Sequence, residues 1–417
     1  MNELIAGIRS RLEGDRVLWG IALVLTLASL VTVYSAISTL AYKADGNSVK
    51  FLFKQAALLA GGWGVMFVVH RMHFKYFGKL ANVLMVLAVV ALVFTFLFGT
   101  DINDARRWIK IPFIGLTVQT SDFAKVALVL WVAKQLQIRG HLMDDFWQGL
   151  APMLGGIGLV CGLILYSDFS TAAMLGAVCL TMMFVGGLPW GRVFQMAGIA
   201  VMALVGLYGL GKAAPEALPR FGTWASRIES FAGFARGEAQ GGTLNDEDYQ
   251  IDLAQVAIYK GGWLPSGPAS GTSRNFLPHP YSDMIYAFIV EEWGALVGGL
   301  GLVLLYLALL FRAAKTAIRC ESTFGRNLVL GLGMMIAVQA LVNMGVSVRL
   351  FPTTGQPLPL VSYGGTSLLF TCLSIGMILA VSRVVLSPEG ASATQGPSSP
   401  SGKNRYRSAN LHKAPSV

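Results

Sequence analysis

Residues 284–311 read MIYAFIVEEWGALVGGLGLVLLYLALLF, and Glu291 and Glu292 are the only charged residues in this stretch. A helix needs ~20 mostly apolar residues to cross the hydrocarbon core of a bilayer. The stretch is long enough and apolar enough for a crossing. We therefore expect it to form a transmembrane helix.

The composition of the whole chain also indicates a membrane protein. The 417 residues are 54% hydrophobic and 13% charged, whereas an average soluble domain carries ~25% charged residues. The formal net charge of +10 would suit a nucleic-acid-binding protein if the basic residues formed one dense stripe, but they are scattered in short clusters between apolar runs. The composition predicts an all-α polytopic membrane protein that binds no nucleic acid.

Ten runs are candidates for crossings, and the first is too long for the apolar core of a signal peptide. They cover residues 17–42, 51–70, 80–99, 117–135, 147–166, 170–188, 191–211, 284–311, 326–348 and 364–385.

Lys and Arg near the ends of the runs give the orientation, because these residues prefer the cytoplasmic side. Ten crossings put both termini in the cytoplasm. The predicted organisation is a cytoplasmic segment 1–16, a transmembrane domain 17–385 with a large outer loop at 212–283, and a disordered cytoplasmic tail 386–417 rich in Ser, Pro, Gly and Lys. Within the outer loop, an acidic run ends at Gln250, and residues 251–260 have helix-like apolar spacing.

One basic cluster breaks the charge rule. Arg106, Arg107 and Trp108 lie in a short predicted outer segment, where positive residues are otherwise fewer for the length of the loops. A cluster of this kind favours an anionic ligand at the outer face.

Charged side chains within membrane helices are costly unless they have a partner or face water. Asp122 and Lys125 are spaced i, i+3, so they share one helix face. They form either a structural ion pair or part of a cavity open to the outer leaflet. Asp168 precedes a run of helical character, and its carboxylate either caps that helix or belongs to the same site.

The acids around the start of the eighth run occupy special positions. Asp283 stands where the outer loop enters the helix, so it is either a helix cap or a carboxylate facing a wet cavity. Glu291 and Glu292 are about two turns deeper, where burial is costly without partners.

Residues 351–367, FPTTGQPLPLVSYGGTS, combine prolines, glycines and the hydroxyl of Ser362. Such backbone is irregular, and membrane proteins tolerate it only where it lines a cavity or is buried in protein. A re-entrant loop and a plain surface turn are the two interpretations. The five histidines show no paired ligand spacing, so no zinc site is predicted.

These motifs resemble the SEDS family (shape, elongation, division, sporulation) of bacterial membrane glycosyltransferases over residues 15–385. The most specific blocks are residues 105–109, 277–294 and 357–367. Residues 343–346 and 351–355 are more similar to the cell-division branch of the family than to its elongation branch. Two patterns of the family are altered here. The fourth helix reads QTSDFAK without its usual proline, and residues 166–171 read YSDFST.

The resemblance implies a ten-helix fold that polymerises lipid II into glycan strands at the outer face of the cytoplasmic (inner) membrane, with release of undecaprenyl pyrophosphate. It also implies a place at the division septum, divisome membrane proteins as partners, and a monofunctional class B penicillin-binding transpeptidase. The catalytic aspartate of the family falls on Asp283.

The chemistry needs a base for the attacking hydroxyl and positive charge for the leaving pyrophosphate. A divalent cation, Mg or Mn, could share the second task, but the sequence shows no dedicated metal site. A lipid II flippase and a divisome scaffold are the alternative functions. The residues expected to bind substrate are Arg106, Arg107, Trp108, Asp122, Lys125, Asp168, Arg227, Gln250, Glu291, Glu292 and Ser362.

Overall fold

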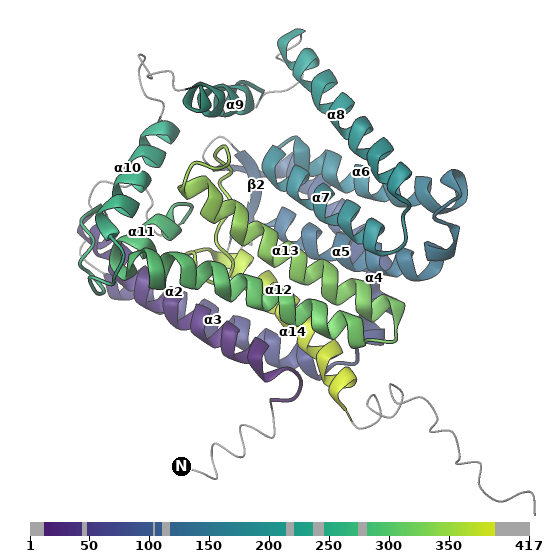
Figure 1. Cartoon of the computed structure of the whole chain (residues 1–417), viewed down its shortest axis with the longest axis horizontal. Helices are drawn as coiled ribbons and strands as arrows, with labels where there is room; N and C mark the ends of the chain where they lie inside the picture. The colour runs from purple at the N-terminus through teal and green to yellow at the C-terminus, as the bar shows by residue number, and fades with distance from the viewer. Residues whose placement is uncertain are drawn as a thin grey trace, which may run out of the picture.

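The computed structural model describes residues 12–43, 48–102, 105–110, 117–213, 221–236, 246–273 and 282–387. Most of the long helices lie side by side in one bundle (Figure 1). The expected tail falls almost entirely outside the described residues, as do residues 1–11.

The bundle helices coincide with the ten expected runs. In chain order they are α2 (Arg16–Lys43), α3 (Ser48–Arg71), α4 (Phe74–Phe98), α5 (Thr120–Arg139), α6 (Ala151–Leu165), α7 (Phe169–Val185), α8 (Trp190–Ala213), α11 (Ile285–Trp293) continued by the π-helix η5 (Gly294–Leu300) and α12 (Gly301–Arg319), α13 (Thr323–Ser347) and α14 (Gly365–Leu386). Two short elements, η1 (Gly140–Leu142) and η2 (Phe146–Leu150), connect α5 to α6.

Seven spans in the described part of the chain are long and apolar enough to cross a membrane, and Phe169–Val185 and Trp190–Gly206 are shorter apolar helices. The all-α polytopic membrane fold is therefore confirmed. The count of ten crossings stays a prediction, because α5 carries too much charge to qualify by composition.

Helix α13 lies at the centre of the bundle, packed against α5, α7, α12 and α14. By contrast, α4 presents Val83, Val86 and Val90 on an exposed face. Apolar side chains on the outside of such a bundle are suited to contact lipid.

The helices differ in how tightly they pack. A Cβ atom on Gly62 of α3 would lie 2.7 Å from Cys372 Sγ of α14, and one on Gly376 of α14 would lie 3.0 Å from the Met66 carbonyl oxygen of α3. Helix α8 projects away from the bundle in Figure 1, and Gly198 and Gly206 have no described atom within 4 Å of such a Cβ.

Both ends of the described chain lie at the same end of the bundle. Arg312 of α12 forms an ion pair with Asp15 at 2.6 Å, and the Arg383 guanidinium of α14 donates to the Arg71 carbonyl at 2.9 Å. The sequence assigned all of these helix ends to the cytoplasm. We call the opposite end of the bundle the outer end, after that prediction.

The outer end carries the elements outside the bundle. A three-stranded antiparallel sheet, which the sequence did not predict, has the order β1 (Thr100–Ile102), β2 (Ala105–Lys110), β3 (Thr117–Gln119). The described part of the expected outer loop contains two helices, α9 (Phe221–Ala235) and α10 (Asp246–Gly261). Helix α10 includes residues 251–260, so the helical spacing was interpreted correctly.

Candidate functional site

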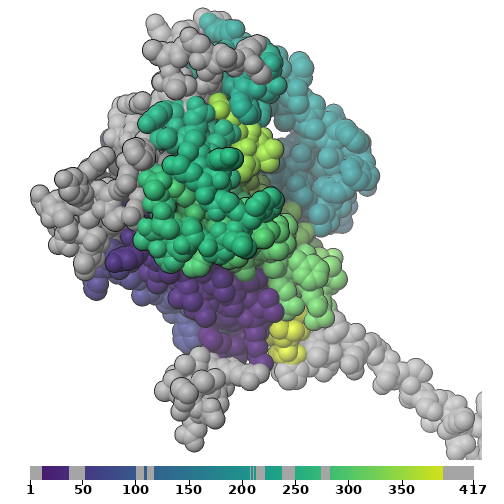
Figure 2. Space-filling model, turned by 60° about the vertical axis from the view of Figure 1, so that its left-hand side comes forward, coloured from purple at the N-terminus to yellow at the C-terminus, as the bar shows by residue number. Residues whose placement is uncertain are grey.

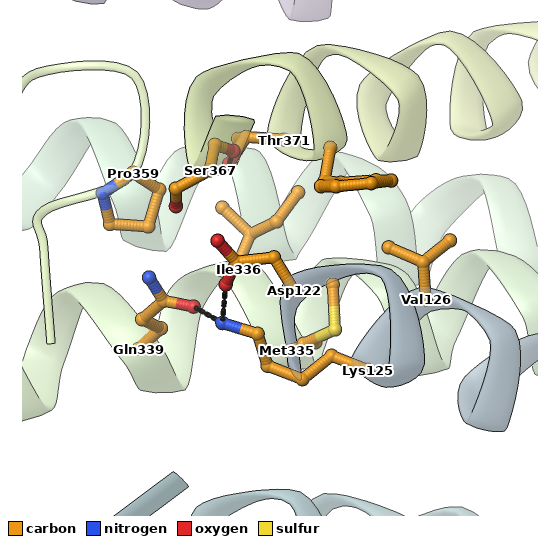
Figure 3. A pocket seen from close by; sticks show the side chains of 10 residues that line it. Asp122, Lys125, Val126, Met335, Ile336, Gln339, Pro359, Ser367 and Thr371 are labelled. Atoms are coloured by element: carbon orange, nitrogen blue, oxygen red, sulfur yellow. Dashed lines mark hydrogen bonds and ion pairs between the residues drawn. The ribbon is translucent and has the colours of Figure 1, made fainter. Parts of the chain in front are cut away.

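The candidate site contains a buried ion pair between Asp122 and Lys125 of α5. Asp122 Oδ1 lies 2.8 Å from Lys125 Nζ, and the two side chains are only 3% and 4% exposed. Lys125 also donates to Gln339 Oε1 on α13 at 3.0 Å. Figure 3 shows the Asp122 carboxylate between Lys125 and Ser367. The predicted sharing of one helix face is confirmed.

A small pocket adjoins this pair. Its walls come from α5, α13, α14 and the irregular chain before α14, and they include Asp122, Lys125, Gln339, Pro359, Ser367 and Thr371. Asp122 Oδ2 has no hydrogen-bond partner among the described residues. The pocket therefore presents both members of the ion pair together with several polar groups. The ion pair is therefore present and a pocket adjoins it, whereas the opening of a cavity to the outer leaflet stays a prediction.

Two amides on α13 connect the ion pair to Asp283. Gln339 Nε2 donates to the Pro357 carbonyl at 2.9 Å. One turn further along, Asn343 Nδ2 donates to the Gln356 carbonyl at 2.7 Å and to the Asp283 carbonyl at 2.9 Å. Helix α13 thus holds Lys125 through one amide and the backbone carbonyl of Asp283 through the other.

Asp283 lies two residues before the first residue of α11 and is half-buried. Its Oδ1 accepts a hydrogen bond from Ser282 Oγ at 2.8 Å, and the Ser282 carbonyl accepts from Ser362 Oγ at 2.8 Å. The cap residue of α11 is Met284, which makes no side-chain capping bond. The interpretation of Asp283 as a helix cap is wrong, because the helix begins one residue too late for it.

Residues 351–364 form the irregular backbone that the prolines and glycines predicted. Gly355 and Leu360 have φ values of 62° and 63°, and Leu358, Leu360 and Ser362 are buried. A Cβ on Gly355 would lie 3.7 Å from Asp283 Oδ2. Residues 358–362 are therefore buried in the bundle while the exposed Gly355 lies beside the acid, and the plain surface turn is wrong.

Asp168 caps α7, as the sequence allowed, and its place in the substrate site stays a prediction. Its Oδ1 accepts from the Thr171 backbone N–H at 3.1 Å, which confirms the cap of α7. Its Oδ2 accepts from Gln356 Nε2 at 3.1 Å. The cap therefore also ties α7 to the irregular segment.

The basic cluster and the outer helices approach the site from outside the bundle. Trp108 of β2 pairs with Gln119 of β3, the residue that precedes α5. Arg106 and Arg107 lie in β2, but their side chains lie outside the described part of the structure. Arg227 of α9 donates to the Thr353 carbonyl at 3.3 Å.

Helix α10 packs on the start of α11. Ile251, Ala254 and Ala257 form a buried cluster with Met284, which follows Asp283, and with other residues of α11 and α13. Gln250 is half-buried at the edge of this contact. The outer loop is therefore packed directly beside the acid.

The sequence did not single out Gln339 or Asn343 as site residues. Their signal is a pair of amides spaced i, i+4 within the apolar stretch 328–346. Arg349 was also missed. It forms an ion pair with Asp252 of α10 at 2.8 Å and lies over the Phe234 ring of α9 at 4.2 Å.

A divalent cation has no evident ligand set. The described residues contain no group of three or more His, Cys, Asp or Glu side chains placed to hold a metal ion. Mg²⁺ and Mn²⁺ prefer several oxygen ligands around one centre. The described residues therefore form no all-protein metal site, and a divalent cation held through a carboxylate and substrate phosphates stays a prediction.

Comparisons with known proteins agree with this architecture. The model of the cell cycle protein family of FtsW, RodA and SpoVE matches residues 15–386. A probable peptidoglycan glycosyltransferase FtsW of Alcanivorax borkumensis is 32% identical over 377 residues, covering 88% of this chain and 92% of the relative.

Two solved structures share the fold. The rod shape determining protein RodA of Thermus thermophilus is 25% identical with a TM-score of 0.63, covering 90% of this chain and 98% of that one. A structure describing how a peptidoglycan synthase complex coordinates polymerization and crosslinking contains a chain that is 24% identical with a TM-score of 0.67. That match covers 89% of this chain and 98% of the other.

Proposed function

We propose, since this chain belongs to the FtsW, RodA and SpoVE family of cell cycle proteins, that it is a SEDS glycosyltransferase that polymerises lipid II during cell division. The proposal places the reaction at the outer face of the cytoplasmic membrane. The similar FtsW of Alcanivorax borkumensis is named as a probable peptidoglycan glycosyltransferase, which supports the activity.

In the proposed reaction a sugar hydroxyl of one substrate attacks the anomeric carbon of another. The new glycosidic C–O bond forms as the C–O bond to the lipid pyrophosphate breaks. The hydroxyl proton passes to the Asp283 carboxylate, which acts as general base. Undecaprenyl pyrophosphate leaves with its negative charge compensated by positive side chains. A single displacement inverts the anomeric configuration, by analogy with inverting glycosidases.

Lys125 is the best-supported candidate for the pyrophosphate, because it lies at the pocket and is already held by Asp122 and Gln339. Arg227 is a second candidate from α9. Arg106, Arg107 and Trp108 remain candidates by their place in β2. No step of the proposal passes through a metal ion.

The observation that carries the proposal is the network across α13. Gln339 and Asn343 connect the buried cation of α5 to the acid before α11 through the carbonyls of residues 356 and 357. A base and an anion site held by one rigid helix are what a transfer from a pyrophosphate donor requires.

We extend the proposal to the cellular location of the chain and to its partner proteins. We place the chain in the inner membrane at the septum with both termini in the cytoplasm. We also propose a class B penicillin-binding transpeptidase and other divisome membrane proteins as partners. The solved complex that shares this fold joins polymerization with crosslinking, which supports a crosslinking partner.

The test is Asp283→Asn in a purified lipid II polymerisation assay. The amide keeps the shape of the side chain, and α11 loses no cap because Met284 holds that position. Loss of a general base lowers rates by roughly 10²-fold to 10⁴-fold. The exposed acid Asp144 gives a matched control, and Asp144→Asn should polymerise at the parent rate.

If Asp283→Asn extends glycans as fast as the parent protein, Asp283 is not the base. A parent protein that transfers lipid II across a bilayer and makes no polymer would instead be a flippase.

A further inference from the structure

Two adjacent acids are buried in α11 beyond the catalytic candidate. Glu291 and Glu292 are 4% and 0% exposed, although a buried carboxylate is costly unless it is well satisfied by hydrogen bonds. The sequence placed both among the substrate-binding residues. Their contacts point to another task.

Glu291 is bound by the end of the loop that follows α10. Its Oε1 accepts from the backbone N–H groups of Thr272 and Ser273 at 3.0 and 3.1 Å, and from Ser273 Oγ at 3.0 Å. A Cβ on Gly271 would lie 2.9 Å from Glu291 Oε2. The loop therefore closes around this carboxylate and leaves little room for a substrate.

Glu292 holds a different part of the same loop. Its Oε1 accepts from the Ala269 N–H at 2.9 Å and from Ser35 Oγ of α2. The Glu292 backbone carbonyl accepts from the N–H groups of Ser266 and Gly267. Figure 2 shows the green region of the chain, which includes α10, this loop and α11, lying against the purple N-terminal helices.

Glu291 binds a part of the loop that lies shortly before Asp283 in the chain. Ser273 is the last described residue before residues 274–281, and the chain then returns at Ser282 and Asp283. Ser362 Oγ donates to the Ser282 carbonyl at 2.8 Å. Glu291 therefore holds Thr272 and Ser273, ten residues or so before Asp283 in the chain, and Ser362 holds Ser282 directly before it.

We infer that Glu291 is a positioning residue, which holds the chain leading to Asp283 and makes no contact with substrate. The inference rests on the proposed function of Asp283. A carboxylate is suited to this task because it accepts several N–H and O–H bonds at once, and bonds to a charged acceptor are about twice as strong as neutral ones.

The test is Glu291→Gln, with Glu292→Gln as the matched control. Both changes remove one charge from neighbouring buried acids, but only the first weakens the acceptor of Thr272 and Ser273, because the amide oxygen of glutamine carries no charge. A displacement of about 1 Å at a reacting group can cost ~10²-fold in rate. We expect Glu291→Gln to lower kcat by ~10-fold to 10²-fold with KM nearly unchanged, and Glu292→Gln to lower kcat less.

Hydrogen–deuterium exchange provides a readout that needs no activity. Glu291→Gln should speed exchange of the Thr272 and Ser273 amides while α13 stays protected. Glu292→Gln should speed exchange at Ala269 instead. A uniform rise across the protein after Glu291→Gln would indicate general destabilisation and would overturn the inference.

Gly271→Ala is a second variant in case Glu291→Gln does not fold. It leaves the carboxylate in place and pushes the loop away from it, so it should give the same loss in kcat alone. The inference fails if either folded variant keeps the parent kcat, or if only KM rises, since that would make Glu291 a substrate contact. Parent activity in Asp283→Asn would instead refute the proposed base, and the exchange result would still report on the anchor.

Discussion

Replacing Lys125 by methionine removes a cation and keeps most of the side-chain volume. The Asp122 carboxylate then loses its partner at 2.8 Å, and Gln339 Oε1 loses its donor. Breaking a buried ion pair by removing one member typically costs ~3 to 5 kcal/mol. We expect Lys125→Met to be strongly destabilised.

The double variant Asp122→Asn with Lys125→Met separates stability from function. Removing both charges leaves no unpaired buried ion, and neutral replacements of buried pairs are often close to neutral in stability. The double variant should therefore regain most of the lost stability. It should not regain activity, because a hydrogen bond to a charged group contributes ~1.5 to 3 kcal/mol, which is roughly 10-fold to 150-fold in rate.

The assay pairs thermal unfolding in detergent with lipid II polymerisation per folded molecule. Unfolding ranks the single variant, the double variant and the parent. If the double variant is as stable as the parent and polymerises at the parent rate, the ion pair is structural, and the pyrophosphate site must lie elsewhere.

Three further outcomes are expected. A cysteine introduced at Tyr259, which is 89% exposed, should react with an impermeant thiol reagent added outside intact spheroplasts. A cysteine at Ile318, which is 82% exposed, should not react. Labelling of both positions from outside would refute the topology. Asn343→Ala should destabilise the protein by ~1 to 3 kcal/mol and slow polymerisation, because the carbonyls of Asp283 and Gln356 lose their donor; unchanged melting and turnover would contradict this. Adding a class B transpeptidase should raise the polymerisation rate, and an unchanged rate would count against activation by that partner.

The sequence predicted the helices well because each run of apolar residues must pair its own backbone groups in lipid. It missed the sheet at the outer end. Its strands are short, and the central strand contains Arg106 and Arg107, which read as a charged loop rather than as alternating residues.

The candidate site was only partly predictable. Asp122, Lys125, Asp168 and Asp283 stood out because charge in a membrane segment needs an explanation. Gln339 and Asn343 did not, because single amides are common in helices and their partners are backbone carbonyls that give no sequence signal. The role of Glu291 was also hidden, since it depends on how the loop at 271–273 folds back onto α11.

The close approach of α3 and α14 sets which substitutions the protein can accept. At Gly62 and Gly376 even a methyl group meets atoms of the facing helix at 2.7 and 3.0 Å. Gly198 on α8 has open space around it. In a library of random variants selected for growth, alanine should therefore be depleted at the first two positions and recovered freely at the third. The same amino acid is a packing requirement in one helix and an incidental residue in another.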